Sequence, residues 1–172
     1  MGKENLRRMA DKQISWVPTA VTMKAYRDTF EQRSKKLRAQ GHSKDPSMLR
    51  INKMAQGASR NLEHQLEQIY QAKKLGVTIA LGTDAGRIGV YHGRSVGEEI
   101  RLLITAGFSV PGAIQCATLN GARLLNLNDY GVIVKGATAT FIAVSGSPQD
   151  LPDSLGRITA LYIRGISVQS LL

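Results

Sequence analysis

Cysteine and long apolar runs are almost absent from this sequence, and each absence excludes a class of protein. The single cysteine, Cys116, cannot form an internal disulfide, which fits a reducing compartment, and we interpret it as a core thiol because no histidine is near it in the sequence. No apolar stretch approaches the roughly 20 residues of a membrane span. The charged start, residues 1–12, lacks the apolar centre of a secretory signal. We therefore expect a cytoplasmic protein with no membrane partner.

Histidine is also scarce, and this scarcity limits metal chemistry. Only His42, His64 and His92 are present, and they fall in a basic segment, a helical pattern and a glycine-rich loop. Zinc needs three or four histidine, thiolate or carboxylate donors within about 2.0 to 2.3 Å of the ion. No spacing of this kind is found in the sequence. We expect His42 and His64 to be solvated surface residues, and we expect no complete zinc site in this chain alone.

The positive charge is concentrated in the first third of the sequence. The net charge is +10, and residues 1–60 carry 14 Lys and Arg against 5 Asp and Glu, whereas residues 61–172 carry 9 against 8. Such a block either contacts nucleic acid or an acidic surface, or is a solvated helical face. Aromatic side chains that would stack on bases are few and are not interleaved with the cations. Nucleic acid is therefore the less favoured partner.

The most informative segment is GVTIALGTDAG at residues 76–86. An apolar, β-branched run at residues 77–81 leads through Gly82 and Thr83 into a single carboxylate, Asp84. This pattern is typical of a buried parallel strand, and ligands bind at the carboxyl ends of such strands. Asp84 is alternatively a turn residue or a helix cap. The small residues around it leave open space for an ion or substrate, which makes Asp84 the best candidate for catalysis and metal binding.

Hydrophobic spacing predicts helices and strands in alternation up to Asn126 and short strands after it. Helices are predicted over residues 3–12 and 24–38, in a long amphipathic stretch that ends at Gly76, over 95–106, and from Ser109 through Leu125. Strands are predicted at 14–17, 77–81, 132–134, 139–144 and 158–163. The apolar residues expected to face the core from the last three helices are Met54, Ala58, Leu62, Leu66, Ile69, Val96, Ile100, Leu103, Ile104, Ala113, Ala117, Leu124 and Leu125. The pattern predicts an α/β body followed by a small β module.

Five segments, taken in order, resemble the C-terminal part of a metal-dependent amidohydrolase of the imidazolonepropionase-like and prolidase-like branch. These segments are VPT at 17–19, LGTDAG at 81–86, YHGRS at 91–95, the helical stretch at 98–127 and GVIVKGATATFIAV at 131–144. The resemblance covers nearly the whole chain. It implies the last two strands, 14–17 and 77–81, of a (β/α)8 TIM barrel with their helices in residues 1–127. It also implies part of a small β-sandwich in residues 128–172.

The same resemblance implies a chemistry and assigns roles to two residues. A divalent metal, with zinc the favoured ion, would activate water for hydrolysis of the C–N bond of a cyclic amide or a dipeptide-like amide. Asp84 would bind the metal and transfer the proton from water to the departing amine. His92 would line the substrate pocket, and Arg87, where the family usually has a smaller residue or proline, would change access to Asp84. The family's remaining ligands match no segment here, so we expect a C-terminal fragment that is inactive alone.

Two further expectations follow from the incomplete barrel and from the charge. Two strands cannot close a barrel, so unpaired edges and apolar faces are expected to remain exposed. They would drive formation of a homo-oligomer or association with the missing barrel half. The alternative function is a non-catalytic binding or assembly module that uses the basic N-terminal third.

Overall fold

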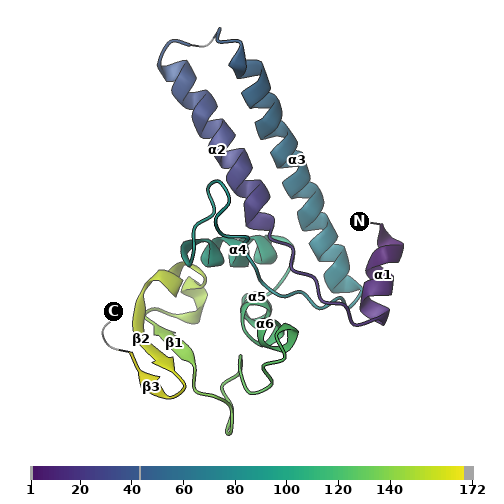
Figure 1. Ribbon diagram of the computed structural model, residues 1–172, viewed down its shortest axis with the longest axis vertical. Coiled ribbons are helices and arrows are strands. Elements are labelled where there is room, and N and C mark those ends of the chain that lie inside the picture. The colour runs from purple at the N-terminus through teal and green to yellow at the C-terminus, as the bar shows by residue number, and fades with distance from the viewer. Residues whose placement is uncertain (1, 43, 169–172) are drawn as a thin grey trace.

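The computed structural model describes residues 2–42 and 44–168 and combines a helical part with a small sheet (Figure 1). Two long helices, α2 and α3, form an antiparallel hairpin that projects from the rest of the molecule, while the sheet lies at the other end. The helices are α1 (Lys3–Asp11), α2 (Ala20–Ala39), α3 (Ser47–Lys74), α4 (Arg94–Thr105), α5 (Val110–Ala117) and α6 (Leu119–Leu124), and the remaining elements are β1 (Phe141–Val144), η1 (Pro148–Asp150), η2 (Asp153–Gly156), β2 (Ile158–Ile163) and β3 (Ile166–Ser167). The α/β class expected from the sequence is confirmed.

The two segments expected to be barrel strands lie side by side and run parallel, but their pairing is short. Trp16 and Ile79 form one isolated parallel bridge. The Trp16 N–H donates to the carbonyl of Thr78 at 2.8 Å, and the Ala80 N–H donates to the carbonyl of Trp16 at 3.0 Å. Ile79 and Ala80 are buried. The expected neighbours and their direction are thus present, whereas full strands over 14–17 and 77–81 are not.

The first helix of the hairpin is longer than the sequence pattern predicts. Helix α2 begins at Ala20, before the expected start at residue 24, and α3 begins at Ser47. The N–H of Ser47 donates to the side chain of Asp45 at 2.7 Å, which satisfies one of the free donors at the start of α3. The expected inner face of α3 is confirmed at Leu62 and Ile69, but Met54 is 41% exposed.

The main core lies where α4 packs against the ends of the hairpin and the buried segment 77–80. The largest apolar side chains with almost no exposure in this core are Leu6, Ile69, Ile79, Ile100 and Leu103. Full burial of an aliphatic side chain of this size contributes about 1.5 to 3 kcal/mol. Cys116 is buried in the same core, as expected for a structural thiol. No helix in the described part of the chain is both long and apolar enough to cross a membrane.

The expected helix over residues 109–125 is divided into two. The backbone of Thr118 departs from helical geometry, with φ −123° and ψ −89°, and this residue separates α5 from α6. As a result, the last turn does not continue the inward-facing stripe. Ala113 is buried as expected, whereas Leu124 and Leu125 are 44% and 68% exposed, so the expectation for these two leucines is wrong.

The C-terminal module is a three-stranded antiparallel sheet in the order β1-β2-β3. Phe141 pairs with Tyr162, and their rings stack with centroids 4.8 Å apart. Strand β2 has the predicted bounds, and β1 is shorter than predicted. The strand expected at 132–134 is wrong, because in the described chain no segment lies beside it to pair with its backbone, and Ile133 is 86% exposed. The division after residue 127 stays a prediction.

Candidate active site

Asp84 lies on an exposed rim four residues after the segment 77–80, in which Val77, Ile79 and Ala80 are buried. Its side chain is 47% exposed, and its backbone has φ +52°, a left-handed conformation that few residues other than glycine adopt. Behind it the loop turns back on itself, with the Gly86 N–H donating to the carbonyl of Val90 at 3.1 Å. Val90 is buried and anchors this turn. The carboxylate is therefore presented outward by a fixed loop, as the sequence predicts.

The segment that leads into Asp84 is also held from its second side. The Leu81 N–H donates to the carbonyl of Cys116 at 2.9 Å, and the side-chain amide of Asn120 donates to the carbonyl of Ile79 at 2.8 Å. These contacts come from α5 and α6, whereas Trp16 contacts the opposite edge of the same segment. The backbone before Asp84 is thus held by Trp16, which precedes it in the sequence, and by Cys116 and Asn120, which follow it.

Arg87 pairs directly with the candidate carboxylate. Its Nε donates to Oδ2 of Asp84 at 3.0 Å, and the two side chains are 60% and 47% exposed. An exposed pair of this kind stabilises a protein by about 0 to 1 kcal/mol, so a ligand of moderate affinity displaces it. The structure shows that the two side chains are in contact, and the predicted effect of Arg87 on access to Asp84 stays a prediction.

The three histidines are all exposed and lie on different parts of the chain. His42 and His64 are on the surface, as expected. His92 follows Asp84 in the same loop, and the Arg94 N–H donates to the His92 carbonyl at 2.8 Å. No hydrogen bond or ion pair joins His92 to Asp84 among the residues described. Its role toward substrate stays a prediction.

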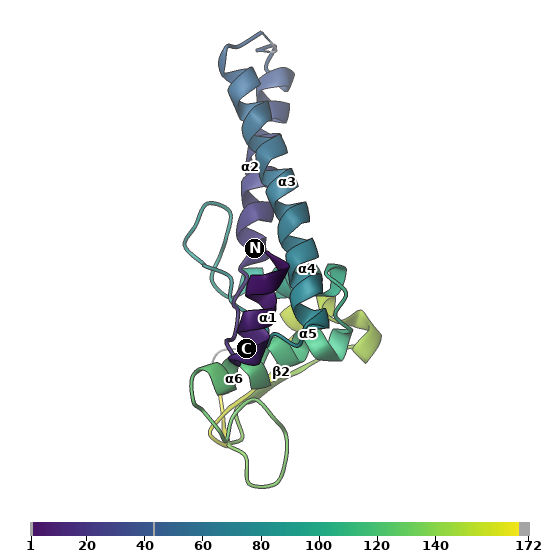
Figure 2. The ribbon, with the colours of Figure 1, turned by 90° about the vertical axis from the view of Figure 1, so that its right-hand side faces the viewer.

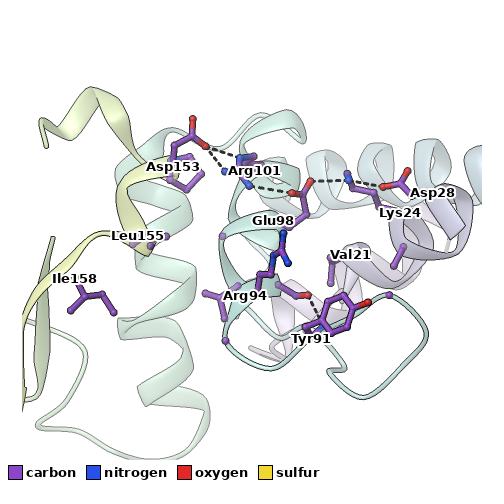
Figure 3. A pocket seen from close by; sticks show the side chains of 18 of the residues that line it. Val21, Lys24, Asp28, Tyr91, Arg94, Glu98, Arg101, Asp153, Leu155 and Ile158 are labelled. Carbon is purple, nitrogen blue, oxygen red and sulfur yellow. Dashed lines mark hydrogen bonds and ion pairs between the residues drawn. The ribbon is translucent and has the colours of Figure 1, made fainter. Parts of the chain in front are cut away.

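A large cavity lies beside this loop rather than at Asp84 (Figure 3). It has a volume of about 890 Å³ and lies between α2, the start of α4, η2 and the sheet. Asp84 and His92 do not line it, although Tyr91 and Gly93 do. The other residues that contribute to its wall include Val21, Arg94, Ser95, Ile142, Pro152, Leu155 and Ile158. The cavity therefore borders the loop of the candidate site but does not contain the candidate carboxylate.

Charged side chains along one wall of this cavity form a continuous chain of ion pairs (Figure 3). Lys24 lies 2.7 Å from Asp28 and 3.2 Å from Glu98, and Arg101 lies 3.1 Å from Glu98 and also pairs with Asp153. Partial burial alone would lower the pKa of Lys24, but its bonds to Asp28 and Glu98 outweigh burial and raise it. These contacts link α2, α4 and η2, so the wall is structural as well as charged.

Glu99 is the buried ionisable residue that sequence reasoning missed. It has no exposed surface, and its two carboxylate oxygens accept the N–H groups of Ala20 and Val21 at 2.9 and 2.6 Å. Burial raises the pKa of Glu99 to about 7, while the two backbone hydrogen bonds act in the opposite direction. Its signal in the sequence was its place between Val96 and Leu103, on the face of the helix expected to be buried.

Comparison with known proteins places this arrangement in a family. The model of the Amidohydrolase family matches residues 19–166. The chain belongs to the amidohydrolase family. This agrees with the resemblance drawn from the five sequence segments.

Solved structures support the assignment of this amidohydrolase-family chain. A Xaa-Pro dipeptidase, solved with methionine bound in its active site, is 26% identical with a TM-score of 0.72, and the match covers 98% of this chain and 37% of that chain. A second structure, an amidohydrolase, is 26% identical with a TM-score of 0.67 and the same coverages of 98% and 37%. An uncharacterised protein at 23% identity and a TM-score of 0.67 shows the shared fold alone. No curated protein matches the chain.

The amidohydrolase-family chain spans little more than a third of the length of these structures, and this bears on metal binding. The family is generally metal-dependent. Among residues 2–42 and 44–168, no group of three or more His, Cys, Asp or Glu side chains is placed to hold a metal ion. Asp84 is a single exposed carboxylate whose nearest charged partner is Arg87. The donor set described here does not fit a zinc ion by itself.

Proposed function

We propose that this chain forms the C-terminal part of the catalytic domain of an amidohydrolase that cleaves the C–N bond of a cyclic amide or a dipeptide-like amide. The observation that carries the proposal is the exposed carboxylate of Asp84 at the end of a buried segment that runs parallel to residues 14–17. In this proposal the two segments are the last two strands of a (β/α)8 barrel. The match over 98% of this chain to a Xaa-Pro dipeptidase supports that arrangement and favours a dipeptide-like amide.

The role that we propose for Asp84 is proton transfer at the reacting bond. A carboxylate at a strand end accepts a proton from the attacking water and returns it to the nitrogen that departs. This role requires Asp84 to exchange its contact with Arg87 for one with the substrate or water, and the half-exposed pair permits that exchange. We propose His92, eight residues further along the same exposed loop, as a residue that contacts the substrate.

The proposed site is complete only with side chains that the described residues do not supply. The completed site would bind a divalent metal, zinc in the first instance. Asp84 offers only one ligand, so the remaining ligands would have to come from the missing strands. We therefore propose that the chain by itself has no hydrolase activity. It would gain activity by association with a polypeptide that supplies the other barrel strands, in the cytoplasm, where its single buried thiol remains reduced.

Exposed apolar side chains support association of this kind. Ile133, Ile166 and Leu125 are 86%, 71% and 68% exposed, and all three belong to the C-terminal half of the chain. Large apolar surfaces left open to solvent favour contact with another protein surface. The partner that we propose is the missing barrel half, and a homo-oligomer is the alternative.

The experiment compares the chain alone with the chain in the presence of the missing part. The purified chain is assayed with added Zn²⁺ against Xaa-Pro dipeptides and cyclic amides, and we expect no turnover. It is then co-expressed with the part of the similar Xaa-Pro dipeptidase that it does not cover, and we expect dipeptide hydrolysis to appear. Asp84→Asn abolishes that activity, whereas Glu63→Gln, an exposed carboxylate change on α3, leaves it unchanged.

Two results would contradict the proposal. Zinc-dependent turnover by the chain alone would refute the claim that its own residues form an incomplete site. Activity of the combined polypeptides that survives Asp84→Asn would show that this carboxylate does not take part in the reaction.

A further inference from the structure

The end of the α2–α3 hairpin projects away from α4, α5 and the sheet in both views (Figures 1 and 2). We define the hairpin end as residues 33–42 and 44–53, which comprise the end of α2, the described part of the turn and the start of α3. Its two helices pack against each other. Met48 and Ile51 are buried between the helices, and the hydroxyl of Ser34 on α2 donates to the amide oxygen of Asn52 on α3 at 2.8 Å. The outer face is therefore a fixed surface.

The hairpin end carries a large excess of positive charge. All seven of its cations are exposed, namely Arg33, Lys35, Lys36, Arg38, Lys44, Arg50 and Lys53. None of them forms an ion pair with another described residue, in contrast to Lys24 and Arg101 beside the cavity. The one carboxylate in the hairpin end, Asp45, accepts the N–H of Ser47 at the start of α3. This concentration of unpaired charge attracts an anionic partner.

One face of α3 at the hairpin end combines these cations with exposed apolar side chains. Leu49 and Met54 are 66% and 41% exposed. Together with Pro46, Arg50 and Lys53 they line a hollow of about 460 Å³. Positions three and four apart lie on the same face of a helix, so the apolar and cationic side chains form one stripe. We call this stripe the α3 stripe.

We propose that the α3 stripe binds an acidic, amphipathic helix of a partner protein. The partner's apolar side chains would cover Leu49 and Met54, and its carboxylates would pair with Arg50 and Lys53. A helix laid along the stripe would pack against the hairpin as a third helix, which is a common mode of peptide recognition. Around the helix, Lys53 and Arg50 lie between Leu49 and Met54, so the stripe is cationic along its middle and apolar at its two edges, and a partner helix that carries both carboxylates and apolar side chains fits it.

Other occupants fit these observations less well. A second copy of this chain would bring the same seven unpaired cations to the contact, and like charges repel. Single-stranded nucleic acid is bound partly by stacking of its bases on aromatic side chains, and no Phe, Tyr or Trp lies among residues 33–53. An anionic membrane would attract all seven cations alike and would not distinguish the cations of the stripe from those on α2.

The test uses a fluorescently labelled synthetic peptide of about three heptads, which forms a helix about 30 Å long. Each heptad has Leu at its two core positions, a and d, and Glu at the other positions. Binding to the full chain is measured by fluorescence anisotropy. We expect Arg50→Glu with Lys53→Glu to weaken binding about tenfold or more, because two attractive contacts become repulsive. The matched control is Lys35→Glu with Lys36→Glu on α2, which changes the net charge equally and is expected to weaken binding by only about twofold.

A second variant isolates the apolar contribution. Leu49→Ser leaves the charge unchanged, and we expect it to weaken binding about tenfold, which corresponds to the loss of one well-buried leucine contact. Because Leu49 is 66% exposed in the free chain, the substitution leaves the hairpin folded, and circular dichroism checks this for every variant.

Three outcomes would overturn the proposal. The first is the absence of binding by the wild-type chain. The second is equal weakening by the charge reversals on α2 and α3, which would show general attraction without a docking face. The third is tighter binding to single-stranded DNA or to phosphatidylserine vesicles than to the acidic peptide, which would assign the hairpin end to a different class of partner.

Discussion

Replacing Glu99 by Gln tests how α4 holds the start of α2. In the folded chain the two carboxylate oxygens of Glu99 accept the N–H groups of Ala20 and Val21, and the side chain has no exposed surface. A glutamine offers one acceptor oxygen, and its amide N–H₂ faces the second backbone donor. Leaving a buried donor without a partner costs about 1 to 3 kcal/mol. At pH 4.5 Glu99 is protonated in the folded chain, but its hydroxyl oxygen still accepts an N–H whereas the glutamine N–H₂ does not, so we expect Glu99→Gln to destabilise the fold by up to this amount.

The difference between the two proteins depends on pH, and its sign follows from the direction of the pKa shift. Burial raises the pKa of Glu99 from 4.5 to about 7 in the folded chain. Between these values the folded state retains a proton that the unfolded state has released, so the free energy of unfolding decreases as pH rises. A shift of this size corresponds to about 3 kcal/mol. The glutamine variant lacks this titration, so the stability of the wild type relative to the variant is expected to fall by about 3 kcal/mol between pH 4.5 and 8, which abolishes or reverses the variant's deficit.

The assay is urea unfolding at constant ionic strength, followed by the fluorescence of the single tryptophan, Trp16, whose backbone pairs with residues 78 and 80. Subtracting the variant from the wild type removes every pH dependence that the two proteins share. Glu63→Gln on the exposed face of α3 serves as the control for the loss of one carboxylate. A deficit of Glu99→Gln that grows with pH would refute the reasoning, because it would show that the two hydrogen bonds outweigh burial.

Leu103 and Cys116 give two separate tests of the core. Leu103 has no exposed surface, so Leu103→Ala is expected to lower the free energy of unfolding by about 2 to 5 kcal/mol, measured by the urea midpoint. A loss under 1 kcal/mol would show that the core at this position is loosely packed. Burial raises the pKa of the Cys116 thiol to about 11, so its reaction with a disulfide reagent at pH 8 is expected to be about a hundredfold slower than in urea. Equal rates in the two conditions would contradict the buried position of Cys116.

Local patterns in the sequence were sufficient to locate the candidate carboxylate. The apolar run before Gly82 and the small residues after Asp84 specify a buried segment that ends at a rim, and this requires no knowledge of distant residues. The spacing of Leu62, Ile69 and Leu103 likewise identified faces that are buried in the structure. These features depend on neighbours within one or two turns of the same element, and such neighbours can be read directly from the sequence.

Features that depend on distant partners could not be predicted in the same way. Helix α2 starts at Ala20 because Glu99, 79 residues away, accepts its first N–H groups. The strand expected at 132–134 depends on a neighbouring strand, which the described chain does not place beside it. The apolar pattern of such a segment shows that it could form a β-strand. Whether it does so depends on a neighbouring strand that can pair with its backbone. The site showed the same limit, since the direct contact of Arg87 with Asp84 depends on how the loop turns.

The position of Asp84 and the chemistry of Asp84 have separate origins in this chain. Its position is set by contacts that the chain itself provides, because Trp16, Cys116 and Asn120 hold the backbone just before it. Its proposed chemistry needs ligands and substrate contacts that no cluster in the described residues supplies. A polypeptide that supplied them would therefore meet a carboxylate already in place, with only the exposed pair to Arg87 to exchange. Such a preorganised carboxylate lowers the cost of completing the site, since little ordering remains for the partner to bring about.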